Sequence, residues 1–110
     1  MIYVQFAGSA YPDILVFSKS GSTESGLGRY KRMAGTISNN RPVWEHEAGN
    51  SFVFSTGTNW MVGPDWKGTR ALFYTALQES IPNHGWQSWD EKGGWQEDPL
   101  LRVDGGHSFS

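Results

Sequence analysis

The sequence contains no cysteine, so no disulfide bond holds the fold together and a packed core must do so. It has no apolar run of about 18 residues or more, and the pattern therefore predicts no membrane span. Residues 1–6 lack the basic and long apolar regions of a signal peptide. Together these features leave the cellular compartment open.

Charged residues are scarce, and neither sign dominates. Only 18% of the residues are charged, and the formal net charge is −2. A nucleic-acid-binding surface usually carries a basic patch. The densest basic cluster, at Arg29, Lys31 and Arg32, is short, and alternate side chains of a strand point to opposite faces. We interpret this cluster as a solvated strand and expect no nucleic-acid partner.

Motifs for catalysis and cofactor binding are missing. The chain has no nucleophile elbow, no P-loop and no dinucleotide fingerprint. His46, His84 and His107 follow no metal-ligand spacing, and no cysteine supplements them. We predict no catalytic residue, no metal ligand and no cofactor, and we interpret His46 as a surface histidine.

A group of carboxylates near the C-terminal end is the one candidate for cation binding. Oxygen ligands of the kind that Ca²⁺ prefers are offered by Asp90, Glu91, Glu97 and Asp98. Their spacing is not that of an EF-hand. Turn formation and solubility explain these residues better, and Ca²⁺ binding stays an open question at this point.

Aromatic and turn-forming residues are abundant instead. Aromatic side chains make up 15% of the 110 residues, and 14 residues are glycine. Glycine and proline divide the chain into short, regularly spaced runs, which is typical of antiparallel β proteins. We predict an all-β fold of about eight short antiparallel strands, arranged as a sandwich or small barrel. A single domain is expected over residues 1–103, with a flexible tail at 104–110.

Strands are expected where apolar and polar residues alternate or where short apolar runs occur. Such runs lie at residues 1–6, 14–17, 29–33, 43–47, 51–55, 59–62 and 100–103. A hairpin is expected over residues 85–97 with its turn at 91–93, and Gly35 is expected to end a strand. Residues 70–77 fit both a strand and a helix, and we favour the strand.

Tryptophan is the most distinctive component of the sequence. The chain has six tryptophans, all after residue 43, and they cannot all pack easily in so small a core. The predicted core consists of large side chains from the least interrupted runs: Tyr30, Val43, Trp44, Phe52, Phe54, Trp60, Val62, Phe73 and Trp86. One or two other indoles are expected at the surface, where a ring beside polar groups can stack on a sugar. The predicted ligand site lies at turn-proximal positions and comprises Trp66, Trp89, Asp65 and Asp90.

Several motifs occur in a characteristic order over residues 12–103. They include Asn40-Arg41-Pro42-Val43-Trp44, Asn59-Trp60-Met61-Val62-Gly63-Pro64-Asp65 and Gly94-Trp95-Gln96-Glu97-Asp98-Pro99-Leu100-Leu101. In this respect the chain resembles a Trp-rich all-β module found in tandem in multidomain proteins of marine invertebrates and in algal and protist proteins. Many of those proteins are predicted to be extracellular and adhesive, so the resemblance implies an extracellular, lectin-like or adhesive role. It implies no catalytic activity and no particular site residue.

The favoured function is that of a non-catalytic binding module that recognises carbohydrate weakly through exposed tryptophan. The alternative is a protein-interaction or self-associating structural domain without a small ligand. A glycoside-type hydrolase is least favoured, because it needs a pair of carboxylates brought together by folding, for example from Glu45, Glu47 and Asp65. A groove with one or two exposed indoles would favour the glycan, and a broad apolar patch would favour a protein.

Overall fold

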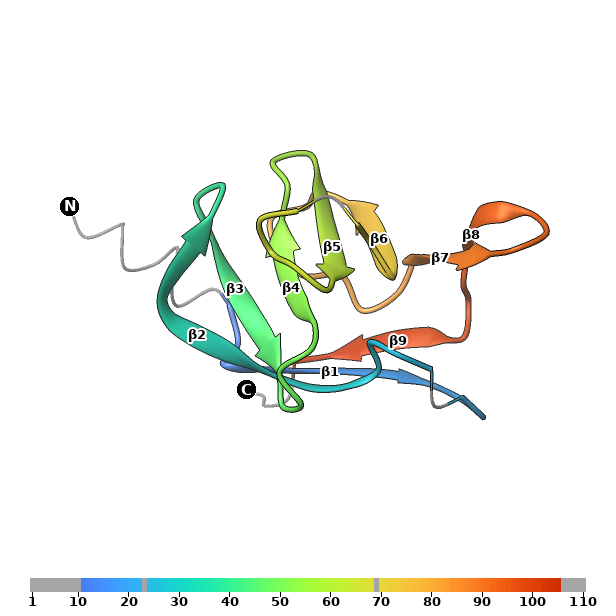
Figure 1. Cartoon of the computed structure of the whole chain (residues 1–110), viewed down its shortest axis with the longest axis horizontal. Coiled ribbons are helices and arrows are strands. Elements are labelled where there is room, and N and C mark those ends of the chain that lie inside the picture. The colour runs from blue at the N-terminus through green and yellow to red at the C-terminus, as the bar shows by residue number, and fades with distance from the viewer. Residues whose placement is uncertain (1–10, 23, 69, 106–110) are drawn as a thin grey trace.

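The computed structural model describes residues 11–22, 24–68 and 70–105, and in these ranges it forms one curled antiparallel sheet without any helix (Figure 1). The strands are β1 (Ile14–Lys19), β2 (Gly28–Ser38), β3 (Arg41–His46), β4 (Phe52–Ser55), β5 (Asn59–Gly63), β6 (Phe73–Ala76), β7 (Gln87–Asp90), β8 (Gly94–Glu97) and β9 (Leu101–Asp104). The predicted all-β fold is confirmed. The sheet has 9 strands, and it curls into a half-barrel in place of a two-sheet sandwich.

Consecutive strands are neighbours along almost the whole sheet. The order is β8-β7-β6-β5-β4-β3-β2-β1-β9, so only β9 departs from the sequential arrangement. It pairs antiparallel with β1, with Lys19 opposite Leu101 and Val16 opposite Asp104. Figure 1 shows β9 running alongside β1 at the bottom of the view. The first and last described strands are therefore in direct contact.

Within the described residues, the loop between β6 and β7 lies against the other side of β9. The Val103 N–H donates to Asn83 O at 2.9 Å, and Asn83 Nδ2 donates back to Val103 O at 2.8 Å. The Asp98 N–H donates to Trp86 O at 2.8 Å. The connection between β6 and β7 thus supplies hydrogen-bond partners for backbone groups that would be unpaired in an edge strand. These bonds link distant parts of the strand order and keep the sheet curled.

The inner face of the sheet holds an aromatic core around Phe17 of β1. The ring of Phe17 contacts those of Tyr30 (5.3 Å) and Trp86 (5.2 Å) edge-on. It also stacks on Phe73, with centroids 6.3 Å apart. Aromatic pairs of this kind contribute about 0.5–1.5 kcal/mol beyond the burial of their area. The predicted core is confirmed except at Phe52, which is only partly buried.

Each fully buried indole has an acceptor for its N–H, as a buried polar group requires. All three donate to backbone carbonyl oxygens outside the strands: Trp44 to Pro12 (3.0 Å), Trp60 to Gln78 (3.2 Å) and Trp86 to Pro82 (2.9 Å). Tyr11 packs edge-on against both Trp44 and Trp60, at 6.0 and 5.9 Å. The segment before β1 therefore covers one end of the core.

The connection of β2 to β3 depends on backbone conformations that asparagine and glycine adopt readily. Asn39 and Asn40 both have positive φ, at 53° and 66°, as a two-residue hairpin turn requires. The expected strand end at Gly35 is wrong, because β2 continues through it as one strand of 11 residues. Gly35 has φ 77° and lies in the register shift between Arg32 and Ile37, so the glycine forms a bulge that bends the strand.

Most other expected elements are found, with shifted ends. The strand interpretation of residues 70–77 is confirmed for Phe73–Ala76, which form β6 between β5 and β7. The hairpin expected over residues 85–97 is β7-β8, with its turn at 91–93. Because β9 extends to Asp104, the predicted tail would begin inside this strand. The expected strand at residues 1–6 lies outside the described residues.

We expect Trp60→Ala to lower the free energy of unfolding by about 3–5 kcal/mol, because it deletes a fully buried indole and its hydrogen bond to Gln78 O. Urea denaturation followed by circular dichroism measures the change. Ile37→Ala is the control, since Ile37 is 65% exposed and its truncation is expected to cost less than about 0.5 kcal/mol. Equal losses in the two variants would contradict the core described above.

Candidate functional site

Three aromatic side chains, Tyr74, Trp89 and Trp95, form what we call the aromatic cluster. Trp89 of β7 lies opposite Trp95 of β8, with ring centroids 5.6 Å apart and ring planes at 75°. Trp95 also contacts Tyr74 of β6 edge-on at 4.8 Å. Trp89 is 58% exposed, whereas Trp95 and Tyr74 are partly buried. The cluster therefore presents one open indole supported by two other rings.

Strand alternation puts the aromatic cluster on the outer face of the sheet. Phe73 and Trp86 are buried in the core. Tyr74 is one residue from Phe73, and Trp89 is three residues from Trp86, so both point away from the core. The Trp89 ring also lies beside Gly94, where an added Cβ would be 3.7 Å from its Cζ3 atom. The hairpin backbone thus supports the exposed indole.

Polar groups border the aromatic cluster. Gln87 of β7 lies between Tyr74 and Glu97 in the strand register. The Tyr74 hydroxyl donates to Gln87 Oε1 at 3.4 Å, and Glu97 is exposed. An apolar ring next to an amide and a carboxylate offers both a stacking surface and hydrogen-bonding groups.

The residues of the sequence-predicted ligand site lie in two different parts of the fold, Asp65 and Trp66 on the connection between β5 and β6, and Trp89 and Asp90 in β7. Trp66, between β5 and β6, is partly buried and has Lys67 Nζ 5.1 Å from its ring centroid. Asp65 shapes that turn, since its Oδ1 accepts the Lys67 N–H at 2.9 Å. Asp90 ends β7 and pairs with Gly94 across the hairpin. The ring contact of Trp89 is with Trp95 and not with Trp66.

Sequence reasoning missed Trp95 and Tyr74 as members of the site. For Trp95 a signal was present, because a hairpin whose turn occupies residues 91–93 must place positions 89 and 95 opposite each other. Tyr74 joins only through the pairing of β6 with β7, where Tyr74 lies opposite Gln87. No local sequence pattern specifies that register, because a connection of several residues separates β6 from β7.

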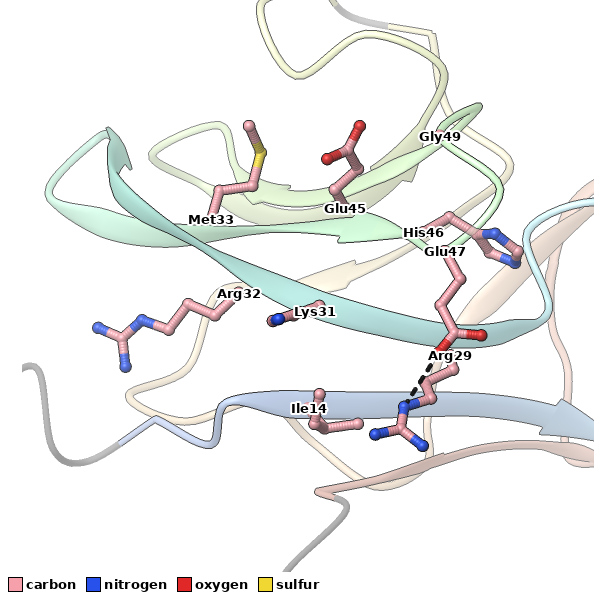
Figure 2. A pocket seen from close by; sticks show the side chains of 9 residues that line it. All are labelled: Ile14, Arg29, Lys31, Arg32, Met33, Glu45, His46, Glu47 and Gly49. Carbon is pink, nitrogen blue, oxygen red and sulfur yellow. Dashed lines mark ion pairs between the residues drawn. The ribbon is translucent and has the colours of Figure 1, made fainter.

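A groove on the outer face of β1, β2 and β3 is lined by alternating charges (Figure 2). Its volume is about 520 Å³. Arg29 Nε lies 3.2 Å from Glu47 Oε2, and Lys31 lies opposite Glu45 in the strand register. Each carboxylate therefore has a cation as a close neighbour or cross-strand partner. In a glycoside hydrolase, by contrast, two carboxyl groups flank the bond to be cleaved.

His46 is half-buried, which corrects its interpretation as a surface histidine. Its Nδ1 accepts the Ala48 N–H at 2.9 Å, so Nε2 carries the proton and donates to Leu27 O at 2.8 Å. The imidazole also packs edge-on against Tyr30, with centroids 4.9 Å apart. Nδ1 is engaged by the turn after β3 and Nε2 by the segment before β2, so the role of His46 is structural.

Tyr30 is a buried tyrosine with two polar partners. Its hydroxyl donates to Gly26 O at 2.6 Å and lies 2.9 Å from Ser51 Oγ. Burial raises the pKa of Tyr30 to about 12, although the bond with Ser51 acts in the opposite direction. The neutral phenol is therefore the form that the fold stabilises.

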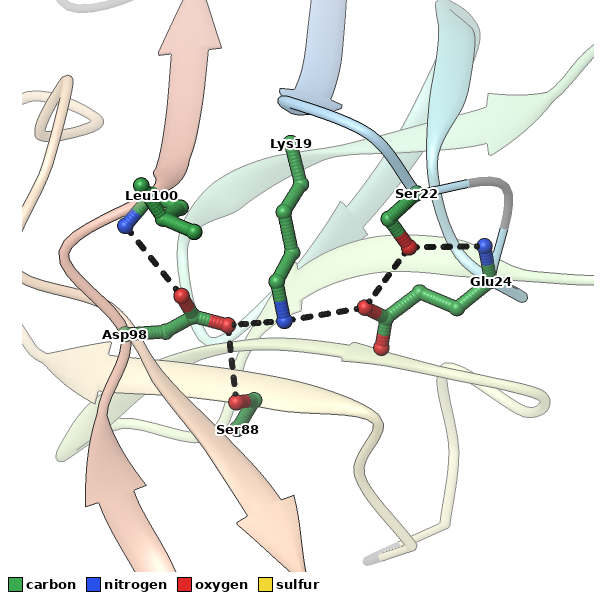
Figure 3. Close-up of polar contacts among 6 residues, drawn as sticks. All are labelled: Lys19, Ser22, Glu24, Ser88, Asp98 and Leu100. Atoms are coloured by element: carbon green, nitrogen blue, oxygen red, sulfur yellow. Dashed lines mark hydrogen bonds and ion pairs between the residues drawn. The ribbon is translucent and has the colours of Figure 1, made fainter.

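Asp98, one of the carboxylates that the sequence offers for Ca²⁺, is buried. Its Oδ2 lies 2.6 Å from Lys19 Nζ and accepts the Ser88 hydroxyl at 2.9 Å, while Oδ1 accepts the Leu100 N–H at 3.2 Å (Figure 3). Glu24 Oε2 lies 3.0 Å from the same Lys19 nitrogen. These contacts join β1, β7 and the turn before β9.

The pKa values of this pair reflect the contacts. Burial alone would raise the pKa of Asp98, but the hydrogen bonds from Lys19, Ser88 and the Leu100 N–H outweigh burial and lower it. The hydrogen bonds to Asp98 and Glu24 raise the pKa of Lys19. Asp98 and Lys19 are therefore ionised at neutral pH, which is the wrong state for a carboxyl group acting as a general acid.

Comparison with models of protein families, with curated proteins and with solved structures finds no match to this chain. Within the described ranges, no three His, Asp or Glu side chains are grouped so that they could hold a metal ion. The same ranges contain no helix with the length and apolar character needed to cross a membrane.

We expect Tyr30→Phe to destabilise the fold by about 1–3 kcal/mol at neutral pH, because Ser51 and Gly26 O lose their buried partner. The contribution of the hydroxyl is fully present below the unfolded-state pKa of about 10. It is lost as pH rises toward about 12, the folded-state value. Unfolding free energies of wild type and variant should therefore converge between these pH values.

Tyr74→Phe is the matched control, since the Tyr74 hydroxyl makes only the long 3.4 Å contact with Gln87. Its difference from wild type at neutral pH should be small. A Tyr30→Phe difference that stays constant with pH would contradict the buried, hydrogen-bonded phenol.

Proposed function

We propose that this chain is a non-catalytic module that recognises carbohydrate, with Trp89 as the stacking surface. The observation that carries the proposal is one large indole that remains 58% exposed although it is supported by Trp95 and by the hairpin backbone. A rigid, open aromatic ring is what the apolar face of a sugar ring requires. The site moves accordingly from the Trp66–Trp89 combination to the aromatic cluster.

Polar groups near Trp89 could orient a bound sugar by hydrogen bonding. The amide of Gln87 and the carboxylate of Glu97 lie on the same outer face, within one strand of the indole. They can accept or donate hydrogen bonds to sugar hydroxyls while the ring provides contact area. Because one exposed indole covers few ligand atoms, the affinity should be weak, about 0.1–1 mM.

Hydrolysis of the bound sugar is disfavoured by the carboxylates described above. The buried carboxylate, Asp98, has a lowered pKa, and Glu47 is paired with Arg29. A glycosidase needs one carboxyl group whose pKa is raised so that it can protonate the leaving oxygen. Binding without turnover is therefore the favoured activity.

A protein-interaction or self-associating domain is the second candidate. Its supporting observation is that β8, which carries Trp95, is the last strand of the sheet order. In the part of the chain that the structure describes, however, the exposed large hydrophobic residues are Ile37 in β2, Trp89 in β7 and Leu100 after β8. They come from three separate elements, and β2 and β7 are not neighbours in the sheet order, which favours a small ligand. An extracellular, adhesive setting stays a prediction from the resemblance.

We expect Trp89→Ala to reduce binding to the best ligand of a glycan array at least about tenfold, a loss of roughly 1.4 kcal/mol or more. The melting temperature should change little, because the side chain is mostly exposed. Isothermal titration with the array ligand, with and without Ca²⁺, measures the effect and tests whether the cation takes part.

Trp66→Ala is the matched control, because it removes the same side chain from the connection between β5 and β6. It should keep the affinity of wild type. Loss of binding in Trp66→Ala alone would restore the sequence-predicted site, and a broad array without any ligand would favour the protein-interaction candidate.

A further inference from the structure

The contact between Lys19 and Asp98 lies where β1, the first described strand, meets the segment before β9, the last. Lys19 is the last residue of β1, and Asp98 precedes β9, the final described strand, which pairs with β1. A covalent bond between the two side chains would therefore tie the first strand to the segment that leads into the last.

The two side chains are held at reacting distance. Lys19 Nζ lies 2.6 Å from Asp98 Oδ2, and the exposed fractions of these side chains are 22% and 7%. Asp98 is fixed from two other directions by Ser88 and by the Leu100 N–H. Holding an amine against a carboxyl group in this way replaces a collision between separate molecules by a reaction within one.

The contacts of Asp98 match those needed for an acyl transfer. Oδ1 accepts the Leu100 N–H at 3.2 Å, which would stabilise the negative charge that develops on this oxygen. Oδ2 receives the hydrogen bonds of Lys19 and Ser88, so it is the oxygen placed to leave as water. Figure 3 shows Glu24 on the other side of Nζ, 3.0 Å away, where its carboxylate can take up a proton.

We propose that Lys19 and Asp98 condense to an intramolecular isopeptide bond. A proton first passes from the Lys19 ammonium to Asp98 Oδ2, which leaves a neutral amine and a neutral carboxyl group. Nζ attacks Cγ, and Glu24 takes a proton from the resulting nitrogen cation. Glu24 then returns this proton to the departing Oδ2 hydroxyl. An N–C bond forms, a C–O bond breaks, and one water molecule leaves.

The reaction is expected to follow folding and to be slow. The contacts of the pair favour its charged form, as the lowered pKa of Asp98 and the raised pKa of Lys19 indicate. The neutral pair that reacts is therefore a minor species. Burial of Asp98 acts in the opposite direction, because it penalises the carboxylate.

The test is the intact mass of the purified wild-type chain, measured under denaturing conditions after prolonged incubation at neutral pH. We expect a mass lower than the sequence mass by one water molecule. Tryptic digestion should then yield one branched peptide that contains both Lys19 and Asp98. This second readout excludes water loss by succinimide formation, to which the sequence Asp104-Gly105 is prone.

Three variants assign the chemistry. Lys19→Arg and Asp98→Ala should keep the full sequence mass and lower the melting temperature by roughly 10 °C or more, because the long cross-linked loop is lost. Glu24→Gln should give the same product several-fold more slowly. Lys31→Arg, which changes a lysine that also lies opposite a carboxylate, is the matched control and should lose water as wild type does.

A wild-type chain that is folded and keeps its full mass would overturn the proposal, because Lys19 and Asp98 would then form an ion pair only. Water loss from wild type without a branched peptide that contains both Lys19 and Asp98 would overturn it as well. The mass of the wild-type chain can be interpreted without any variant. Neither result depends on the ligand of the aromatic cluster. The carbohydrate proposal is therefore tested independently of this one.

Discussion

A sheet with one apolar face must cover that face, and this chain has neither a second described layer nor a cysteine cross-link with which to do so. Curling is the remaining solution, and Phe17 is the side chain on which it depends. Phe17 contacts Tyr30 in the adjacent strand, but it also contacts Phe73 and Trp86, which belong to the opposite part of the strand order. These contacts bring distant parts of the apolar face together.

Closure also explains why one indole stays outside the core. Strand β7 pairs with β6 only through Ser88 and Gln87, whereas all four of its residues pair with β8. The distal half of this hairpin therefore extends beyond the aromatic core, and Figure 1 shows it projecting at the right of the view. Trp89 lies in that half, so its side chain is not buried in the core. Trp95 and Gly94 support it from within the hairpin, and the result is an exposed ring on a stable backbone.

The sequence allowed prediction of what depends on local patterns. Choosing large side chains from the least interrupted runs identified eight of the nine predicted core positions, although it omitted Phe17. The turn at residues 91–93 contained the signal that pairs Trp89 with Trp95, although the prediction did not use it. The position of β9 beside β1 was not predictable, because 81 residues separate the ends of these strands and no local pattern specifies the partner of an edge. For the same reason Asp98 looked like a surface acid. Its burial and its contact with Lys19 exist only after β9 has joined β1.

The contact of Lys19 with Asp98 fixes the register of β9 against β1, which the pattern of apolar residues does not determine fully. A slip of β9 along β1 by one residue would turn Leu101 and Val103 outward, so burial of apolar side chains prevents it. A slip by two residues would keep both inside, and burial alone discriminates against it poorly. Such a slip, however, would move Asp98 away from Lys19 and leave a carboxylate buried without its cation, which is strongly unfavourable. The apolar residues therefore select the face of β9, and the charged pair selects its register.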